Sequence, residues 1–350
     1  MSYTPPTSDS ASWQPNTGQA QFDVSVVRPI NPAIDWIKGV LFPFDFTRWL
    51  TLTVPIFFIY CAENLTSGLG QLNNFGGPGP TAPGADGLED IPGKVNGYLA
   101  NNMGTVVLVV VAGLVLWTCI VAIAQFLSSR MEFIHIENMI TGVPAVAEPW
   151  TRLGSLANSL FLFRMMIYAL SMLVSVPLAI ISFFQFMSFL EGNDSQEVLS
   201  LIMGFFVKMI GLLLILSPIF IGIEIVRLFT KDFVVPIMYR RNLRVGRAWG
   251  LLWDLVMSNK GSFAIYVLFR MVIAVAMGLI MAILGCLLTL ACCIGAIPVI
   301  GQMAYLPLFG FRRIYAVLYL EQFGPDWEIF RRDYALPPDN YDGPPATYQY

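Results

Sequence analysis

The chain has 350 residues, of which 56% are hydrophobic and only 12% are charged, and its mean hydropathy is +0.66. A water-soluble protein is excluded, because one soluble core could not bury so much apolar side chain and ordinary soluble domains carry about 25% charged residues. The net charge of −3 argues against a nucleic-acid partner, since nucleic acids select basic surfaces. The composition therefore predicts an integral membrane protein with lipids among its partners.

Six apolar runs of 17 to 28 residues suit the roughly 20 residues that a membrane-spanning helix needs. We therefore expect an all-α fold, a polytopic transmembrane helical bundle, within residues 33–325. The predicted spans cover residues 49–65, 105–127, 160–187, 206–229, 263–290 and 297–320. The last two come from one long apolar stretch that the motif CCIGAIPVIG interrupts, where residues 291–303 could form either a turn or a re-entrant loop.

The basic residues predict the orientation. If six spans alternate, 17 of the 20 basic residues lie on one side of the membrane. The positive-inside rule assigns that side to the cytoplasm, so both termini are expected there. The predicted location is the inner (cytoplasmic) membrane of a bacterial cell, as a multi-pass protein.

Both ends of the chain differ from its body. Residues 1–32 form a polar, Pro/Ser-rich tail without the basic and apolar regions of a signal peptide, and residues 326–350 form a Pro/Tyr-rich tail. Neither composition can build a core alone. Just after the first tail, AIDWIKGVLFPFDF suits a short helix lying in the membrane interface.

Two segments follow one pattern: an acid and a Phe, a Trp 16 or 17 residues later, and an arginine early in the next span. The residues are Glu132, Phe133, Trp150 and Arg164 in the first segment, and Asp232, Phe233, Trp249 and Arg270 in the second. The pattern predicts a duplication of helical hairpins in parallel orientation. Chance similarity among apolar segments is the alternative.

Charges inside spans suggest interactions, because an unpaired charge in hydrocarbon is costly. Glu224 and Arg270 lie at similar depths on consecutive spans, so we predict an ion pair between them, with Arg164 as the competing partner and Arg227 as a weaker one. Snorkelling of the arginines to the membrane surface is one alternative, and binding of a substrate or a lipid phosphate is another.

Four arginines crowd the segment between the fourth and fifth spans: Arg240, Arg241, Arg244 and Arg247. At helical pitch they can share a face. One interpretation is that they only fix the topology; the other is that they hold anionic lipid headgroups.

The motif order resembles a family of uncharacterised bacterial multi-pass membrane proteins, a domain of unknown function, over roughly residues 40–325. The resemblance is carried by PFDFTRWL, EPWTRLGSLANSLFLFR, KDFVVPIMYRR, the RAW elbow, CCIGAIPVIG and LEQFGPDW. It implies a membrane fold and no activity. The chain is also distantly similar to the membrane domain of some glycerophosphodiester phosphodiesterases, whose soluble catalytic domain has no counterpart in this sequence.

No constellation points to an enzyme. His135 is the only histidine, and it lies near no nucleophile elbow; its spacing from Glu132 and Glu137 does not suit a metal, and the five cysteines lie in or beside apolar runs. We therefore expect no catalytic residue, metal or cofactor. Two functions remain: a structural or accessory subunit of a larger membrane assembly, with other subunits or further copies as partners, or a transporter or lipid-handling protein that uses the repeated hairpins.

Overall fold

The computed structural model describes residues 24–66, 91–190, 198–290 and 298–330, and this part of the chain contains helices and no strand. The helices are α1 (Ile30–Leu41), α2 (Phe46–Thr66), α3 (Ile91–Thr141), α4 (Ala147–Arg152), α5 (Gly154–Leu190), α6 (Val198–Phe229), η2 (Thr230–Val234), α7 (Val235–Arg241), α8 (Val245–Ser258), α9 (Lys260–Leu290), α10 (Pro298–Met303), α11 (Leu306–Glu321) and η4 (Pro325–Trp327). For these residues the predicted all-α fold is confirmed.

Five helical segments are long and apolar enough to cross a membrane: Phe46–Thr66, Gly104–Thr141, Gly154–Phe184, Phe206–Arg241 and Lys260–Leu287. Many of their apolar side chains are exposed, such as Leu116 (64%), Leu173 (72%) and Ile215 (73%), and Phe46–Thr66 is the most buried of the five segments. Apolar helices of this length that do not bury their side chains in protein are typical of contact with hydrocarbon. The described residues thus have the architecture of a multi-pass membrane protein.

The sixth predicted span, residues 297–320, is not among these five segments. It contains two shorter helices, α10 with six residues and α11 with 16, whereas the five segments have 21 to 38 residues. Nine of the 16 residues of α11 are buried against other helices. The expected turn or re-entrant loop at 291–303 falls partly outside the described residues, and its last six residues form α10.

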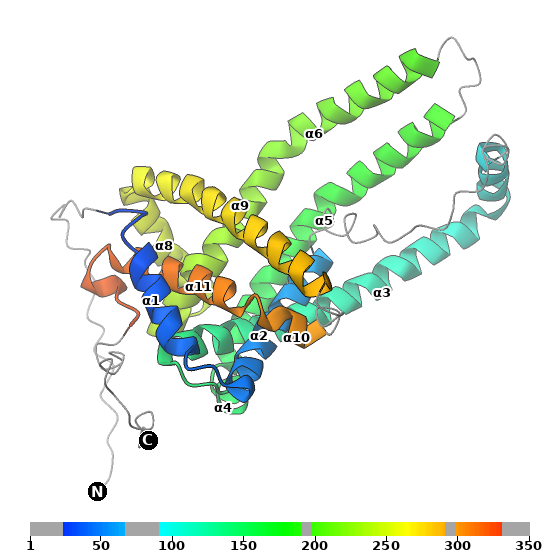
Figure 1. The fold of residues 1–350 in the computed structure, drawn as a ribbon. Helices are drawn as coiled ribbons and strands as arrows, with labels where there is room; N and C mark the ends of the chain where they lie inside the picture. Colours follow the sequence, from blue (N-terminus) through cyan, green and yellow to red (C-terminus); the bar gives the residue numbers. More distant parts are fainter. Residues whose placement is uncertain (1–23, 67–90, 191–197, 291–297, 331–350) are drawn as a thin grey trace, which may run out of the picture.

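α11 returns the chain alongside α9 (Figure 1). The Tyr319 hydroxyl donates a hydrogen bond to the carbonyl of Ser262 at 2.8 Å, and the rings of Tyr266 and Tyr315 stack with centroids 6.1 Å apart. Increasing residue numbers in α9 thus meet decreasing numbers in α11, so the two helices are antiparallel.

The core lies where α3, η2, α9 and α11 meet, and aromatic rings fill it. Phe133, Phe233, Tyr266 and Tyr319 are fully buried, and Phe263 is 2% exposed. The Phe233 ring lies 4.8 Å from that of Tyr266 and 5.5 Å from that of Phe263, distances at which aromatic pairs attract. From this core α3, α5 and α6 extend far beyond the other helices (Figure 1).

Both ends of the described chain pack together. The Ser25 backbone exchanges two hydrogen bonds with the Gln322 side chain, at 2.9 and 3.0 Å, and the Trp36 ring meets that of Phe330 at 4.6 Å. Residues 24–32 and 326–330 of the two predicted tails are thus among the described residues, and the rest of both tails lies outside them. A helix is present where an interfacial one was predicted, and this helix, α1, packs its apolar face on α11.

Candidate functional site

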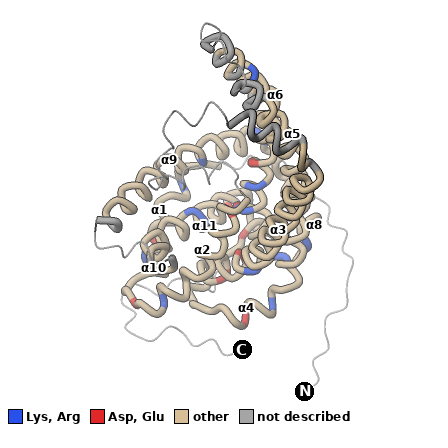
Figure 2. The backbone as a smooth tube through the Cα atoms, turned by 90° about the vertical axis from the view of Figure 1, so that its right-hand side faces the viewer, with Lys and Arg blue, Asp and Glu red and all other residues tan. Residues whose placement is uncertain are grey.

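Two carboxylates lie in the core at or near the two elbows, which are the segments that connect α3 to α5 and α6 to α9. Glu132, on α3, is fully buried, and Asp232, in the π-helical turn η2, is 2% exposed. A π turn inserts an extra residue into the helical repeat and is frequent at functional sites. Figure 2 shows charged positions gathered at this end of the molecule, with few along α5 and α6.

Each of these carboxylates pairs with an arginine near the start of the next long helix. Arg164 Nη2, from α5, donates to Glu132 Oε2 at 3.2 Å, and Arg270 Nε, from α9, donates to Asp232 Oδ2 at 3.0 Å. Tyr266, one turn before Arg270, donates its hydroxyl proton to the same oxygen of Asp232 at 2.9 Å. The two elbows therefore carry the same acid–arginine pairing.

A second arginine reaches Glu132 from α11. The Arg313 guanidinium forms an ion pair with Glu132, and its Nη1 donates to the carbonyl oxygen of Lys231 at 2.5 Å. Glu132 thus joins α3, α5 and α11 through two buried ion pairs.

The predicted ion pair between Glu224 and Arg270 is not formed. The Glu224 side chain is 67% exposed and accepts a hydrogen bond at 2.9 Å from Arg227, the partner expected to be the weaker one. Arg270 faces the opposite way, into the core, because η2 carries Asp232 there.

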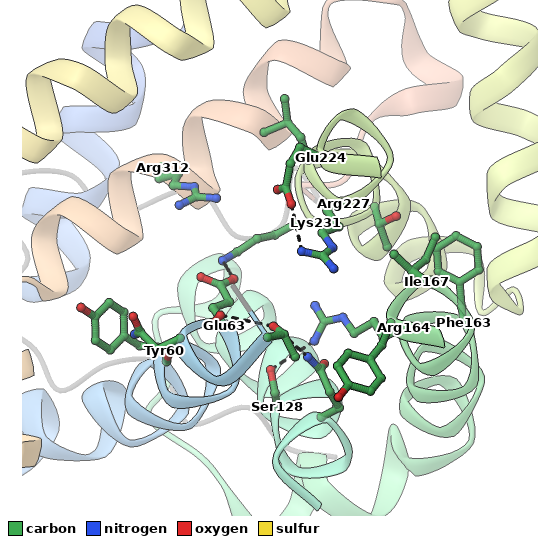
Figure 3. Close-up of a pocket in the computed structure, with 16 residues that line it drawn as sticks. Tyr60, Glu63, Ser128, Phe163, Arg164, Ile167, Glu224, Arg227, Lys231 and Arg312 are labelled. Carbon is green, nitrogen blue, oxygen red and sulfur yellow. Dashed lines mark hydrogen bonds and ion pairs between the residues drawn. The ribbon is translucent and has the colours of Figure 1, made fainter. Parts of the chain in front are cut away.

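A pocket of about 390 Å³ with several charged residues in its lining opens beside this ionic cluster, among α2, α3, α5, α6 and α11 (Figure 3). Glu63, near the end of α2, forms an ion pair across it with Lys231. Arg164 Nη1 donates to the Ser128 hydroxyl at 3.2 Å, and Arg227 Nη2 donates to Ser171 Oγ at 3.0 Å. The side chains of Arg164, Arg227, Lys231 and Arg312 converge on the same space (Figure 3).

Two hydrogen-bond donors in the pocket lining lack acceptors within the described part of the chain. The Tyr168 side chain belongs to a residue that is only 4% exposed, and its buried hydroxyl has no partner. Arg312 Nε is likewise buried and unpaired. A buried donor without an acceptor costs about 1–3 kcal/mol, so both atoms favour a ligand that supplies acceptors.

The pocket lining is positively charged overall. It contains four basic residues, Arg164, Arg227, Lys231 and Arg312, against two carboxylates, Glu63 and Glu224. Glu132 does not line the pocket, but it pairs with the lining residue Arg164 and with Arg313. Including Glu132 and Arg313 adds one charge of each sign, so the surplus is still two positive charges.

A family model described as a family of unknown function, DUF7544, matches residues 24–327. The chain belongs to this family. The expected membership of a family of unknown function is thereby confirmed, whereas the expected likeness to the membrane domain of glycerophosphodiester phosphodiesterases is not shown. No curated protein and no solved structure matches the chain.

In this DUF7544 member, two of the four clustered arginines hold the C-terminal segment of the described chain. Arg240 Nε donates to the carbonyl of Glu328 at 3.2 Å, and Arg241 Nη2 donates to that of Asp326 at 2.6 Å while its guanidinium lies over the Trp327 ring. The other two, Arg244 and Arg247, are exposed at the beginning of α8.

Glu321, the last residue of α11, also fixes this segment. Its Oε1 accepts hydrogen bonds at 2.8 Å from the backbone N–H groups of Ile329 and Phe330. Burial raises the pKa of the Glu321 carboxyl, and these two hydrogen bonds oppose the rise only in part.

The histidine and the described cysteines form no site of their own. His135 is 4% exposed among core residues, and Cys61, Cys119 and Cys286 are free thiols. Within the described ranges, no three His, Cys, Asp or Glu side chains come together as a metal site would require. Cys292 and Cys293 lie outside those ranges.

Sequence reasoning did not assign Glu63, Tyr168, Lys231 or Arg312 to the pocket. Lys231 and Arg312 looked like topology signals at the ends of spans, and Tyr168 like an apolar helix residue. The one available signal was the recurring acid–Phe and arginine pattern, whose acids and arginines do meet.

Proposed function

We propose that this chain is a non-enzymatic integral membrane protein that handles lipid, and that its pocket binds the headgroup of an anionic lipid. The observation that carries the proposal is the pair of buried donors without acceptors, Tyr168 OH and Arg312 Nε, among basic side chains in one cavity. Basic residues with free donors suit an anion with several acceptor oxygens.

The surroundings of the pocket favour a lipid over a free hydrophilic solute. On α5, exposed Leu170 and Leu173 follow the pocket residue Tyr168 within two turns. On α6, exposed Ile219 and Ile221 precede the pocket residue Glu224. A headgroup in the pocket would therefore have apolar helix surface beside it for its acyl chains.

Lipid analysis of the purified protein tests this function. Native mass spectrometry in mild detergent should detect an anionic phospholipid bound to the wild-type chain and much less on Arg312→Gln. Arg152→Gln is the matched control, because Arg152 is 49% exposed and pairs with Glu137 and Glu148 away from the pocket. Equal lipid content in all three proteins would contradict the function.

The predicted topology, six spans with both termini in the cytoplasm of a bacterial cell, belongs to the same proposal. The antiparallel pairing of α9 with α11 supports a sixth crossing made of α10 and α11 together, since neither is long enough alone. The hydrogen bonds between Ser25 and Gln322 support a topology in which both ends of the chain lie on the same side of the membrane. Cysteines introduced at residues 80 and 193 should react with an impermeant thiol reagent from outside intact cells; reaction at residue 243 would contradict the model.

We also propose that the two elbows descend from one duplicated hairpin. The support is that Glu132 with Arg164 and Asp232 with Arg270 repeat one contact between an elbow acid and the following helix. Superposing the two hairpins should align Phe133 with Phe233 and Arg164 with Arg270. A displacement of either pair by more than one helical turn, about 5.4 Å, would contradict the duplication.

The second candidate is a structural or accessory subunit of a membrane assembly. It is favoured by the most apolar stretches of Gly104–Thr141 and Phe206–Arg241, of which only 6% is buried within the described part of the chain. Helices from other subunits or from another copy could cover them. Gentle solubilisation followed by native electrophoresis should then give a particle larger than the single chain; a particle of one chain with lipid would leave the lipid-handling function alone.

A further inference from the structure

We propose that the pocket selects a phosphate monoester, a headgroup that carries two negative charges, over the singly charged phosphate diesters of most anionic phospholipids. This inference rests on the proposed lipid function and names its ligand class. Phosphatidic acid has such a headgroup.

The charge balance of the pocket carries the choice. Its lining holds two more basic groups than carboxylates, and the buried neighbours Glu132 and Arg313 leave that surplus unchanged. Uncompensated charge away from water is costly, so a ligand that brings two negative charges stabilises the pocket more than a ligand that brings one. A phosphate monoester carries about −1.5 to −2 at pH 7, because its second pKa is near 6.

The ion pairs within the lining indicate which basic group would meet the negative charge of the ligand. Three of the four basic residues already form an ion pair with a carboxylate. The pairs are Lys231 with Glu63, Arg227 with Glu224, and Arg164 with Glu132. Arg312 forms no direct ion pair with a carboxylate among the described residues, although Glu63 attracts it across the pocket, and its Nε is buried without an acceptor. Its neighbour Arg313 points away, to Glu132, so the two adjacent arginines have different tasks.

The donors match the oxygens of the ligand. A phosphate monoester has three terminal oxygens, which accept strong hydrogen bonds, whereas a diester has two. Arg312 Nε and the Tyr168 hydroxyl are the free buried donors, and the ammonium of Lys231 has protons beyond the one that it gives to Glu63. The three donors line one cavity of about 390 Å³, within the usual size of a ligand site.

The test uses the full chain in detergent and measures the thermal unfolding midpoint during titration with three probes. These are dioctanoyl phosphatidic acid, dioctanoyl phosphatidylglycerol and inorganic phosphate. We expect phosphatidic acid to bind about tenfold more tightly than phosphatidylglycerol at pH 8, and this preference to disappear at pH 5, where the monoester carries one charge.

Two variants assign the effect to the pocket. Tyr168→Phe removes only an unpaired hydroxyl, so it should fold as well as the wild type and bind phosphatidic acid about tenfold more weakly, the worth of one hydrogen bond to a charged group. Arg312→Gln should abolish the preference for phosphatidic acid, and Arg152→Gln should leave it unchanged.

The possible results distinguish failure of the monoester preference from failure of the proposed lipid function. Equal binding of the two lipids, or a preference that does not change with pH, would overturn the monoester and keep an anionic-lipid pocket. Stabilisation by inorganic phosphate without stabilisation by phosphatidic acid would keep a site for a doubly charged phosphate and overturn both the lipid and the monoester. Binding of neither lipid nor phosphate would overturn both.

Discussion

Asp232 accepts a hydrogen bond from the Arg270 guanidinium at 3.0 Å, with the two side chains only 3% and 5% exposed. Asp232 lies in η2, directly after α6, and Arg270 lies in the third turn of α9, so this pair joins the end of one long helix to the next inside the core. Tyr266 donates to the same carboxylate oxygen, which satisfies a third buried polar group.

Breaking this pair should destabilise the protein strongly. Asp232→Asn or Arg270→Gln leaves one charge buried and unpaired, and each should lower the free energy of unfolding by about 3–5 kcal/mol. The double variant should cost less than the two single losses combined, because the second change removes the charge that the first one strands. Denaturant unfolding in detergent measures all three.

Glu224→Gln is the matched control for that series. Its carboxylate is exposed and pairs with Arg227 on the same helix, so its loss should cost less than about 1 kcal/mol. A loss as large as that of Asp232→Asn would show that Glu224 supports the core after all.

Glu132 should be the more sensitive of the two elbow acids. It pairs with Arg164 and with Arg313, so Glu132→Gln strands two buried guanidinium groups where Asp232→Asn strands one. We expect a lower unfolding midpoint for Glu132→Gln than for Asp232→Asn in the same detergent. The reverse order would mean that Arg313 is held mainly by the Lys231 carbonyl.

The two elbows are recognisable in the sequence, whereas the buried partners of their acids are not, for a physical reason. Hydropathy ended the second span at residue 127, because Ser128 and Glu132 read as polar loop residues. In the structure α3 continues to Thr141, and these polar residues are buried against protein. Hydropathy cannot distinguish a polar residue in water from one that is paired inside a core.

The same limitation applies to α11 and the pocket. Arg312 and Arg313 are neighbours in the sequence, yet one lines the pocket and the other reaches Glu132. This division depends on helix packing between segments nearly 200 residues apart. The apolar helices, in contrast, follow directly from composition and length, and five of the six predicted spans lie in candidate membrane-crossing helices.

The C-terminal segment offers a contrast between neighbouring arginines. Arg241→Ala removes a hydrogen bond to Asp326 and the contact with Trp327, so hydrogen exchange at 325–330 should accelerate several-fold. Arg244→Ala should leave that exchange unchanged, because Arg244 is exposed. Equal acceleration by both variants would contradict the assignment.

Glu321 predicts a specific pH dependence. Its pKa is raised in the folded protein, so the folded state binds the proton more tightly than the unfolded one, and this group's contribution to stability falls as pH rises from the ordinary glutamate value through the raised pKa. Glu321→Gln keeps an oxygen acceptor for Ile329 and Phe330 and has no charge to bury. Its unfolding midpoint should lack this component of the pH dependence between pH 4 and neutral; an unchanged profile would exclude Glu321 as its source.

Photo-crosslinking inside cells tests the lipid pocket most directly. A photoreactive phenylalanine analogue at Phe163 lies in the pocket lining, and the same analogue at Leu173 lies on the exposed apolar face of the same helix. Mass spectrometry of the crosslinked lipids should find anionic headgroups enriched at Phe163, with phosphate monoesters foremost, and the average membrane composition at Leu173. The same composition at both positions, or no lipid at Phe163, would contradict the account.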